Sequence, residues 1–206
     1  MTAVRSLRLL HTELDACRAC PKMIGPVVHG PPVDSRVILV GQAPGPREGS
    51  FGRPFAWTAG RTMFRWFEES MGVDEATFRA RVYMAAVARC FPGKAKGGGD
   101  RRPDAGEIEQ CRAWLEREAE ILRPELVVAV GTLAIEQILA QKAPLADVVG
   151  TIRRARWHGR QVDVVALPHP SGASTWHKME PGITLLCKAL AKLAKHPAMR
   201  RAILPS

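Results

Sequence analysis

The chain has 206 residues, the size of one sizeable domain and short for two. Hydrophobic residues make up 46% of it and charged residues 24%, a balance that excludes disordered, collagen-like and fibrous classes. No run approaches the roughly 20 apolar residues of a membrane helix, and the first residues lead into a charged amphipathic segment rather than a secretory signal. We therefore expect one domain over residues 1–206, in a cytoplasmic monomer that contacts no membrane.

The net charge is strongly positive: 30 Lys and Arg side chains stand against 20 Asp and Glu, which gives +10. Most of this excess lies in residues 151–206. A basic surface of this kind suits a polyanion, and nucleic acid is the first candidate. A solvated basic face without such a partner is the alternative.

Hydrophobic periodicity predicts alternating helices and strands. Five segments with helical spacing predict helices over residues 4–16, 59–70, 104–122, 132–140 and 183–195. Asp104 followed by Glu107 has the form of a capping box. Four short apolar runs predict buried strands over residues 37–40, 82–87, 126–130 and 162–166. The alternation predicts an α/β protein, a three-layer α/β/α fold with a central four-stranded parallel sheet.

Parallel sheets place their sites beyond the carboxyl ends of the strands, and three unusual segments follow such ends here. These are residues 41–55, 90–103 and 168–175, so we expect them to meet on one rim. The second has three consecutive glycines, which predict a mobile loop. It also carries basic side chains that could contact DNA, namely Lys94, Lys96, Arg101 and Arg102.

The first segment begins Gly41-Gln-Ala-Pro-Gly45, which lacks the spacing of a nucleotide-binding P-loop. It offers instead a tight turn of backbone amides that could bind an anion or a carbonyl, unless it is a plain turn. Glu48 is the lone carboxylate of this loop and could orient water, or be a solvated charge. Phe55 could serve as a platform for a nucleobase, or pack in the core.

The third segment holds His169 between Pro168 and Pro170, where two prolines fix the backbone. Such a histidine could present one ring nitrogen to a ligand, and a structural histidine is the alternative. Small hydroxyls and open amides follow, the usual donors to phosphate oxygens, at Ser171, Ser174 and Thr175.

Five cysteines are present, and a reducing compartment favours a metal site or cluster over a disulfide framework. Cys17 and Cys20 form a C-x2-C pair, and Cys90 and Cys111 are separated by 20 residues. Cys187 lies in the last expected helix, where we expect it to pack as a small hydrophobic side chain.

In combination these motifs resemble the uracil-DNA glycosylase superfamily, most closely its iron–sulfur-containing family 4, over roughly residues 7 to 190. The resemblance rests on motifs that occur in the family's order: Cys17-x2-Cys20, Gly41-Gln-Ala-Pro-Gly45, Gly52-Arg-Pro-Phe55 with Ala59-Gly60, Cys90 with Cys111, and His169-Pro-Ser171. It implies an enzyme that flips uracil out of single- or double-stranded DNA and hydrolyses its N-glycosidic bond, leaving an abasic site.

The resemblance also implies roles for individual residues. Phe55 would stack on the flipped uracil, the amides of Gly41, Gln42 and Ala43 would hold its polar edge, and His169 would donate to O2 as negative charge develops there. Pro170 and the Ser/Thr residues that follow it would contact DNA. Cys17, Cys20, Cys90 and Cys111 would hold a structural [4Fe–4S] cluster, with zinc as the chemical alternative.

The sequence also departs from the family. The family's acidic residue after the first glycine is Gln42 here, a catalytic candidate that can orient water but cannot act as a carboxylate base. The aspartate of the related family 1 pattern is Ala43, which leaves Glu48 as the carboxylate candidate for positioning water. An asparagine that reads the base is replaced by Ala86. Hypoxanthine or xanthine is therefore an alternative substrate, and a non-catalytic or product-retaining damaged-DNA-binding protein is an alternative function. A redox or scaffold protein that binds nucleic acid only by charge is a further alternative.

Overall fold

The computed structural model describes residues 2–204. The strands are β1 (Val37–Gly41), β2 (Tyr83–Ala86), β3 (Leu126–Val130), β4 (Ile152–Trp157) and β5 (Arg160–Leu167). The helices are α1 (Ala3–Asp15), α2 (Glu48–Phe51), α3 (Thr58–Met71), α4 (Glu75–Arg81), α5 (Ala105–Leu122), α6 (Thr132–Leu139), α7 (Leu145–Val148), the 3-10 helix η1 (Trp176–Lys178), α8 (Gly182–Lys195) and α9 (Pro197–Ile203). Within the described part of the chain, no helix combines the length and apolar character needed to cross a membrane.

The strands form one sheet in the order β2-β1-β3-β5-β4. The parallel pairs are β1 with β2, β1 with β3, and β3 with β5, so all four predicted strands and their parallel arrangement are confirmed. Every residue of β1, β2 and β3 is buried, as expected for strands covered on both faces.

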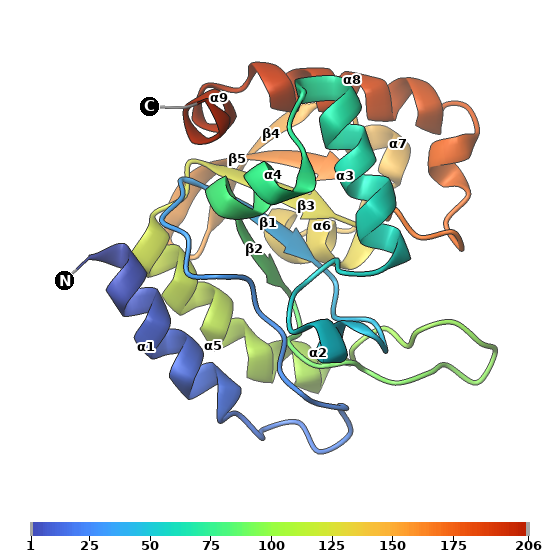
Figure 1. Cartoon of the computed structure of the whole chain (residues 1–206). Helices are drawn as coiled ribbons and strands as arrows, with labels where there is room; N and C mark the ends of the chain where they lie inside the picture. Colours follow the sequence, from blue (N-terminus) through green and yellow to red (C-terminus); the bar gives the residue numbers. More distant parts are fainter. Residues whose placement is uncertain (1, 205–206) are drawn as a thin grey trace.

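Helices cover both faces of the sheet and make three layers (Figure 1). α1 packs against α5, while α3 packs against α8 and α4 against α9. All five predicted helices are present within two residues of their expected ends, and the capping box of Asp104 and Glu107 is formed at the start of α5. The predicted α/β/α fold is therefore confirmed.

The sheet has five strands, so the predicted count of four is wrong. The additional strand, β4, pairs antiparallel with β5 at the edge of the sheet through a tight turn at His158 and Gly159, both with positive φ. Its Ile-Arg-Arg-Ala-Arg-Trp sequence is mostly exposed. A charged edge strand lacks the apolar run that identified the buried strands, and its charges protect the edge from further pairing.

Cys187 is exposed on α8, so the expectation that it packs as a hydrophobic side chain is wrong. Its neighbour Leu186 is the residue that points into the core. A one-residue step along a helix turns the side chain by about 100°, which is enough to exchange a buried position for an exposed one.

Candidate active site and cysteine cavity

A cavity of about 610 Å³ lies where the loops after β1, β2 and β5 meet. Gly41 and Glu48 line it from the first loop, Lys94 and Asp100 from the second, and His169 from the third. The three predicted segments therefore share one rim. The second loop extends from the body of the molecule beside α2 (Figure 1).

His169 enters this cavity in a fixed orientation. The backbone N–H of Ser171 donates to its Nδ1 at 3.2 Å, so the ring carries its proton on Nε2 when neutral. Gly131, with φ of 84°, leaves room for the ring, because a Cβ there would lie 3.1 Å from the imidazole Cδ2. Burial lowers the pKa of His169, which favours the neutral ring. The arrangement is that of a neutral Nε2–H donor.

Phe55 lines the same cavity and is 9% exposed. Its φ is 53°, in the left-handed region that costs a non-glycine residue roughly 1–2 kcal/mol. Two glycines make this conformation possible: a Cβ at Gly41 would lie 2.8 Å from the Phe55 ring, and one at Gly60 only 1.7 Å from the Phe55 carbonyl oxygen. The ring therefore has little freedom to move.

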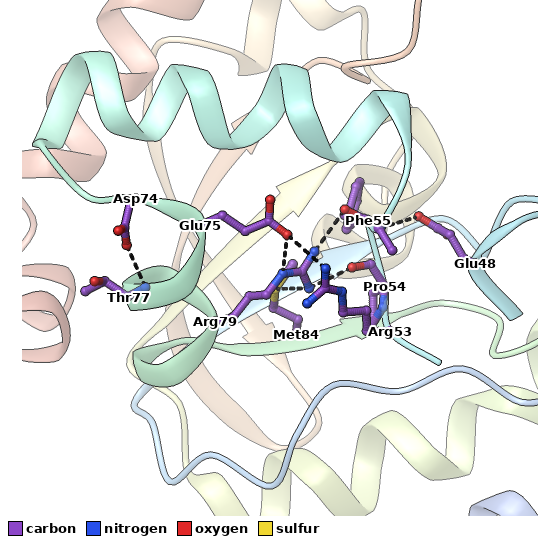
Figure 2. A network of polar contacts seen from close by, with 10 residues as sticks. Glu48, Arg53, Pro54, Phe55, Asp74, Glu75, Thr77, Arg79 and Met84 are labelled. Carbon is purple, nitrogen blue, oxygen red and sulfur yellow. Dashed lines mark hydrogen bonds and ion pairs between the residues drawn. The ribbon is translucent and has the colours of Figure 1, made fainter. Parts of the chain in front are cut away.

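Arg79 of α4 holds the backbone at Phe55 from below (Figure 2). Its guanidinium donates to the Pro54 carbonyl at 2.8 Å and to the Phe55 carbonyl at 2.9 Å. It is itself ion-paired with Glu75 at 2.8 Å and lies 4.6 Å from the centre of the Phe64 ring. A buried arginine thus offsets the strain at Phe55. Neither periodicity nor spacing in the sequence points to it.

Glu48 also fixes this loop. One carboxylate oxygen accepts from the Gly45 N–H at 2.9 Å and the other from the Ala56 N–H at 3.0 Å. Burial raises the pKa of this carboxyl, and the two N–H donors act in the opposite direction. With both oxygens bonded to the backbone, Glu48 joins the two ends of the loop that presents Phe55.

The remaining predicted base-contacting positions also line the cavity, namely Gly41, Gln42 and Ala43. Ala86 pairs with Gly41 in the sheet and lines the cavity as well. The Gln42 carbonyl accepts from the Ala88 N–H at 3.0 Å, which holds the turn against the end of β2.

The predicted DNA-contacting residues fall into four groups. Ser171, Ser174 and Lys94 line the cavity, while Lys96 and Thr175 are exposed outside it. Pro170 is buried. Arg101 and Arg102 are ion-paired with Glu107 and Glu136, so they anchor the base of the loop.

Sequence reasoning missed an aromatic cluster on the cavity rim. Trp57 is 42% exposed and stacks on Phe51, with ring centres 5.8 Å apart. The Arg47 and Arg61 guanidiniums lie 5.0 and 5.7 Å from the centre of its indole. Exposed aromatic rings beside arginines suit stacked bases and phosphates. The signal available in the sequence was the Phe-Gly-Arg-Pro-Phe-Ala-Trp run over residues 51–57.

A second cavity, of about 660 Å³, is lined by Cys17, Cys20, Cys90 and Cys111. They come from the loop after α1, the segment after β2, and α5. Burial and the neighbouring thiols raise the pKa of Cys20 and of Cys90 to about 11. Four thiolates so close together therefore need a cation. Among residues 2–204, no group of His, Cys, Asp and Glu is arranged around a single metal ion.

Arg89 lines the cysteine cavity and is 1% exposed. Its Nη2 donates to Glu118 at 2.5 Å, whereas its Nε and Nη1 have no hydrogen-bond partner among the described residues. Unpaired buried N–H groups cost free energy unless an acceptor meets them. Donors beside four thiolates fit an anionic, sulfur-rich group, because hydrogen bonds to the sulfurs stabilise such clusters.

The fold and the two cavities define a class: an α/β protein with an aromatic shelf, a neutral histidine donor and a four-cysteine cavity. The family model of the Uracil DNA glycosylase superfamily matches residues 27–194, most of the chain. The chain belongs to this superfamily, and the predicted resemblance is confirmed.

Curated relatives are similar over most of the chain. A Type-4 uracil-DNA glycosylase of Pyrobaculum aerophilum is 30% identical over 172 residues, 80% of this chain and 83% of that protein. One of Archaeoglobus fulgidus is 28% identical over 82% of this chain and 83% of its own length. One of Sulfurisphaera tokodaii is 26% identical over 68% of this chain, and the aligned part spans 61% of that longer protein. The family and these relatives confirm the prediction that the chain is an enzyme of the uracil-DNA glycosylase type.

Proposed function

We propose that the chain is a monofunctional uracil-DNA glycosylase that acts on uracil flipped out of DNA and leaves an abasic site. The observation that carries this proposal is that His169, with its proton on Nε2, and the Phe55 ring line one cavity of about 610 Å³. Its volume lies in the range of small-molecule sites and accommodates one base. The superfamily membership and the names of the relatives support the same reaction.

The Nε2–H group of His169 would promote cleavage of the glycosidic bond. When the C1′–N1 bond breaks, its electron pair leaves with uracil, and negative charge develops on O2 while the sugar becomes cation-like. An N–H held in place for that oxygen stabilises the transition state more than the ground state. A neutral imidazole also suits the site, since an imidazolium would repel the developing sugar cation. The low pKa of His169 serves this role.

Phe55 and the amides of the Gly41–Ala43 turn would orient the base. The strained, doubly held backbone at Phe55 keeps the ring in place before the base arrives, so little ordering is needed on binding. Ala86 has no side-chain amide that could hydrogen-bond to the polar edge of the base. Gln42, which lines the same cavity, is the side-chain amide that could take this role. Hypoxanthine and xanthine are the alternative bases that the assay should include.

The cavity rim would bind DNA. Ser171, Ser174 and Lys94 line the cavity and would contact the phosphates that flank a flipped nucleotide, and Trp57 with Arg47 would support a neighbouring base. Flipping costs a few kcal/mol, and these contacts together with the positive net charge of +10 would offset it.

The four cysteines would hold a [4Fe–4S] cluster in a structural role. Three observations support a cluster: the four thiol ligands, the raised pKa that neighbouring thiols give Cys20, and two N–H groups of Arg89 that have no partner within residues 2–204. Such a cluster would supply a rigid cross-link between α1, β2 and α5. A zinc ion is the alternative, which elemental analysis and absorbance near 400 nm distinguish.

The test uses purified chain in excess over oligonucleotides that contain uracil, hypoxanthine or xanthine, single- and double-stranded, with alkali cleavage as the readout. We expect strand cleavage at uracil, and a fall of roughly 10²–10³-fold in the rate for His169→Ala with folding retained. His158→Ala, in the turn between β4 and β5 and outside this cavity, is the matched control and should behave like the unchanged chain. Tight binding of uracil-DNA without any release would instead identify a damage-binding protein.

A further inference from the structure

Hydrolysis needs an acceptor for a water proton, and the expected carboxylates do not provide one. Position 42 is an amide and position 43 a methyl group. Glu48 lines the cavity, but both of its oxygens accept backbone N–H groups. Proton transfer to Glu48 would weaken the two hydrogen bonds that hold its loop, so a carboxylate from another segment is the better candidate.

Asp100 meets this requirement. It lines the same cavity as His169, although it lies in the loop after β2 and 69 positions earlier in the chain. One of its oxygens, Oδ1, accepts from the Lys94 ammonium at 2.6 Å. The other, Oδ2, faces the turn after β1, 3.7 Å from the position a Cβ would take on Gly45. The charge of Asp100 also acts on His169, where it raises the pKa against the effect of burial.

The loop that carries Asp100 is anchored at its base. Arg101, the next residue, donates from its backbone to the Gly93 carbonyl at 2.8 Å and from Nε to the Pro92 carbonyl at 2.7 Å. Its two terminal nitrogens bind both oxygens of Glu107 at 2.7 and 2.8 Å. Lys94 and Asp100 form a bridge across the two arms of the loop. Asp100 is therefore held at the fixed end of the loop, and the glycines lie beyond it.

We propose that Asp100 is the catalytic carboxylate of this chain, supplied by the β2–α5 loop in place of the residue missing at positions 42 and 43. This inference rests on the proposed glycosylase function. The C1′–N1 bond breaks with its electron pair on uracil, the water oxygen bonds to C1′, and Asp100 takes the proton that this water loses. Before that step its negative charge stabilises the sugar cation.

Under this proposal, removal of the Asp100 charge slows catalysis but does not weaken DNA binding. Asp100 is exposed and negative, so by charge alone it weakens attraction to DNA, and Lys94 only partly compensates it. Asp100→Asn removes the charge and keeps the side-chain shape. It should leave DNA affinity unchanged or tighter, and slow the chemical step by roughly 10²-fold or more, the usual contribution of a general base.

The experiment measures single-turnover uracil release with saturating enzyme, and separately the affinity for an oligonucleotide whose 2′-fluoro uracil nucleotide resists cleavage. Asp100→Glu, which keeps the carboxylate, should recover release to within about tenfold of the unchanged chain. Asp147→Asn, at an exposed aspartate on α7, is the matched control and should match the unchanged chain. Because Asp100 lies in an exposed loop, the thermal midpoints of these variants should agree within a few degrees.

Release by Asp100→Asn within threefold of the unchanged chain would overturn the inference and leave the proposed function intact. A loss confined to DNA affinity, with normal release at saturation, would overturn it as well. If the unchanged chain releases no uracil, the proposed function itself fails, which is a different outcome from either of these.

Discussion

Glu48 has two candidate roles, to position water or to hold the loop that presents Phe55. The sequence left it as the candidate for positioning water, since it is the lone acidic side chain of its loop. In the structure its oxygens bind the N–H groups of Gly45 and Ala56 and close the loop over the cavity. Each oxygen is committed to a backbone N–H, so a proton taken up by Glu48 would weaken the hydrogen bonds that close this loop. Its contribution to the reaction would come through the placement of Phe55.

Substitution of this residue separates the two roles. Glu48→Gln keeps one acceptor but turns an amide nitrogen toward the second N–H, so we expect a loss of about 1–2 kcal/mol in the free energy of unfolding. Uracil release should fall by about tenfold at most, whereas removal of a general base would cost 10²–10⁴-fold. Urea denaturation and single-turnover release measure the two effects. Glu69→Gln, an exposed position on α3, should change neither.

At the level of elements, a buried polar network joins α1, β2 and α5. Nε2 of His11 hydrogen-bonds to the Tyr83 hydroxyl at 2.9 Å, and that hydroxyl donates to Glu118 at 2.7 Å. Glu118 also accepts from Arg89 at 2.5 Å. Because the hydroxyl gives its proton to Glu118, Nε2 of His11 is the donor to the hydroxyl. The network connects the cysteine cavity to the sheet.

This network makes stability depend on pH. Burial, followed by the neighbouring His29, lowers the pKa of His11 from 6.5 to about 4. A histidine with a lowered pKa binds fewer protons folded than unfolded, so its stabilisation is present above pH 6.5 and is lost as the pH falls toward 4. We expect the free energy of unfolding to drop by about 1–2 kcal/mol between pH 7 and pH 5. Urea midpoints at both values test this, and His11→Asn should flatten the difference. An equal pH dependence in that variant would contradict the assignment to His11.

The elements that could be predicted from the sequence share one property: a regular pattern of apolar residues, which arises because one or both faces are buried. This pattern identified β1, β2, β3 and the body of β5, which are buried. It did not identify β4, which carries three arginines at an exposed edge of the sheet. The same holds for the site. His169 and Phe55 stand out beside prolines and glycines. Arg79 contacts the Phe55 backbone, and Asp100 lines the cavity beside His169, so both act between segments that are distant in the sequence. The sequence alone does not show which loops meet, and neither residue could be predicted from it.

For the molecule as a whole, the segment that follows β2 contributes residues to both cavities. β2 leads through residues 87–89 to Cys90, which lines the cysteine cavity, and then into the loop that brings Lys94 and Asp100 to the active-site cavity. A cluster bound at Cys90 would therefore fix the start of that loop, and the ion pair of Arg101 with Glu107 fixes its end. The proposed cluster would stabilise the place from which the catalytic loop extends, without taking part in the reaction.

Loss of a cysteine ligand should accordingly affect the whole fold. Cys17→Ser removes one of the four thiols around the cavity, and we expect loss of absorbance near 400 nm, reduced iron content and a lower thermal midpoint. Cys187→Ser, at the exposed fifth cysteine on α8, is the matched control and should retain iron, absorbance and stability. Iron bound equally in both variants would show that the cavity is not the cluster site. Zinc in place of iron in the unchanged chain would assign the same four thiols to the alternative metal.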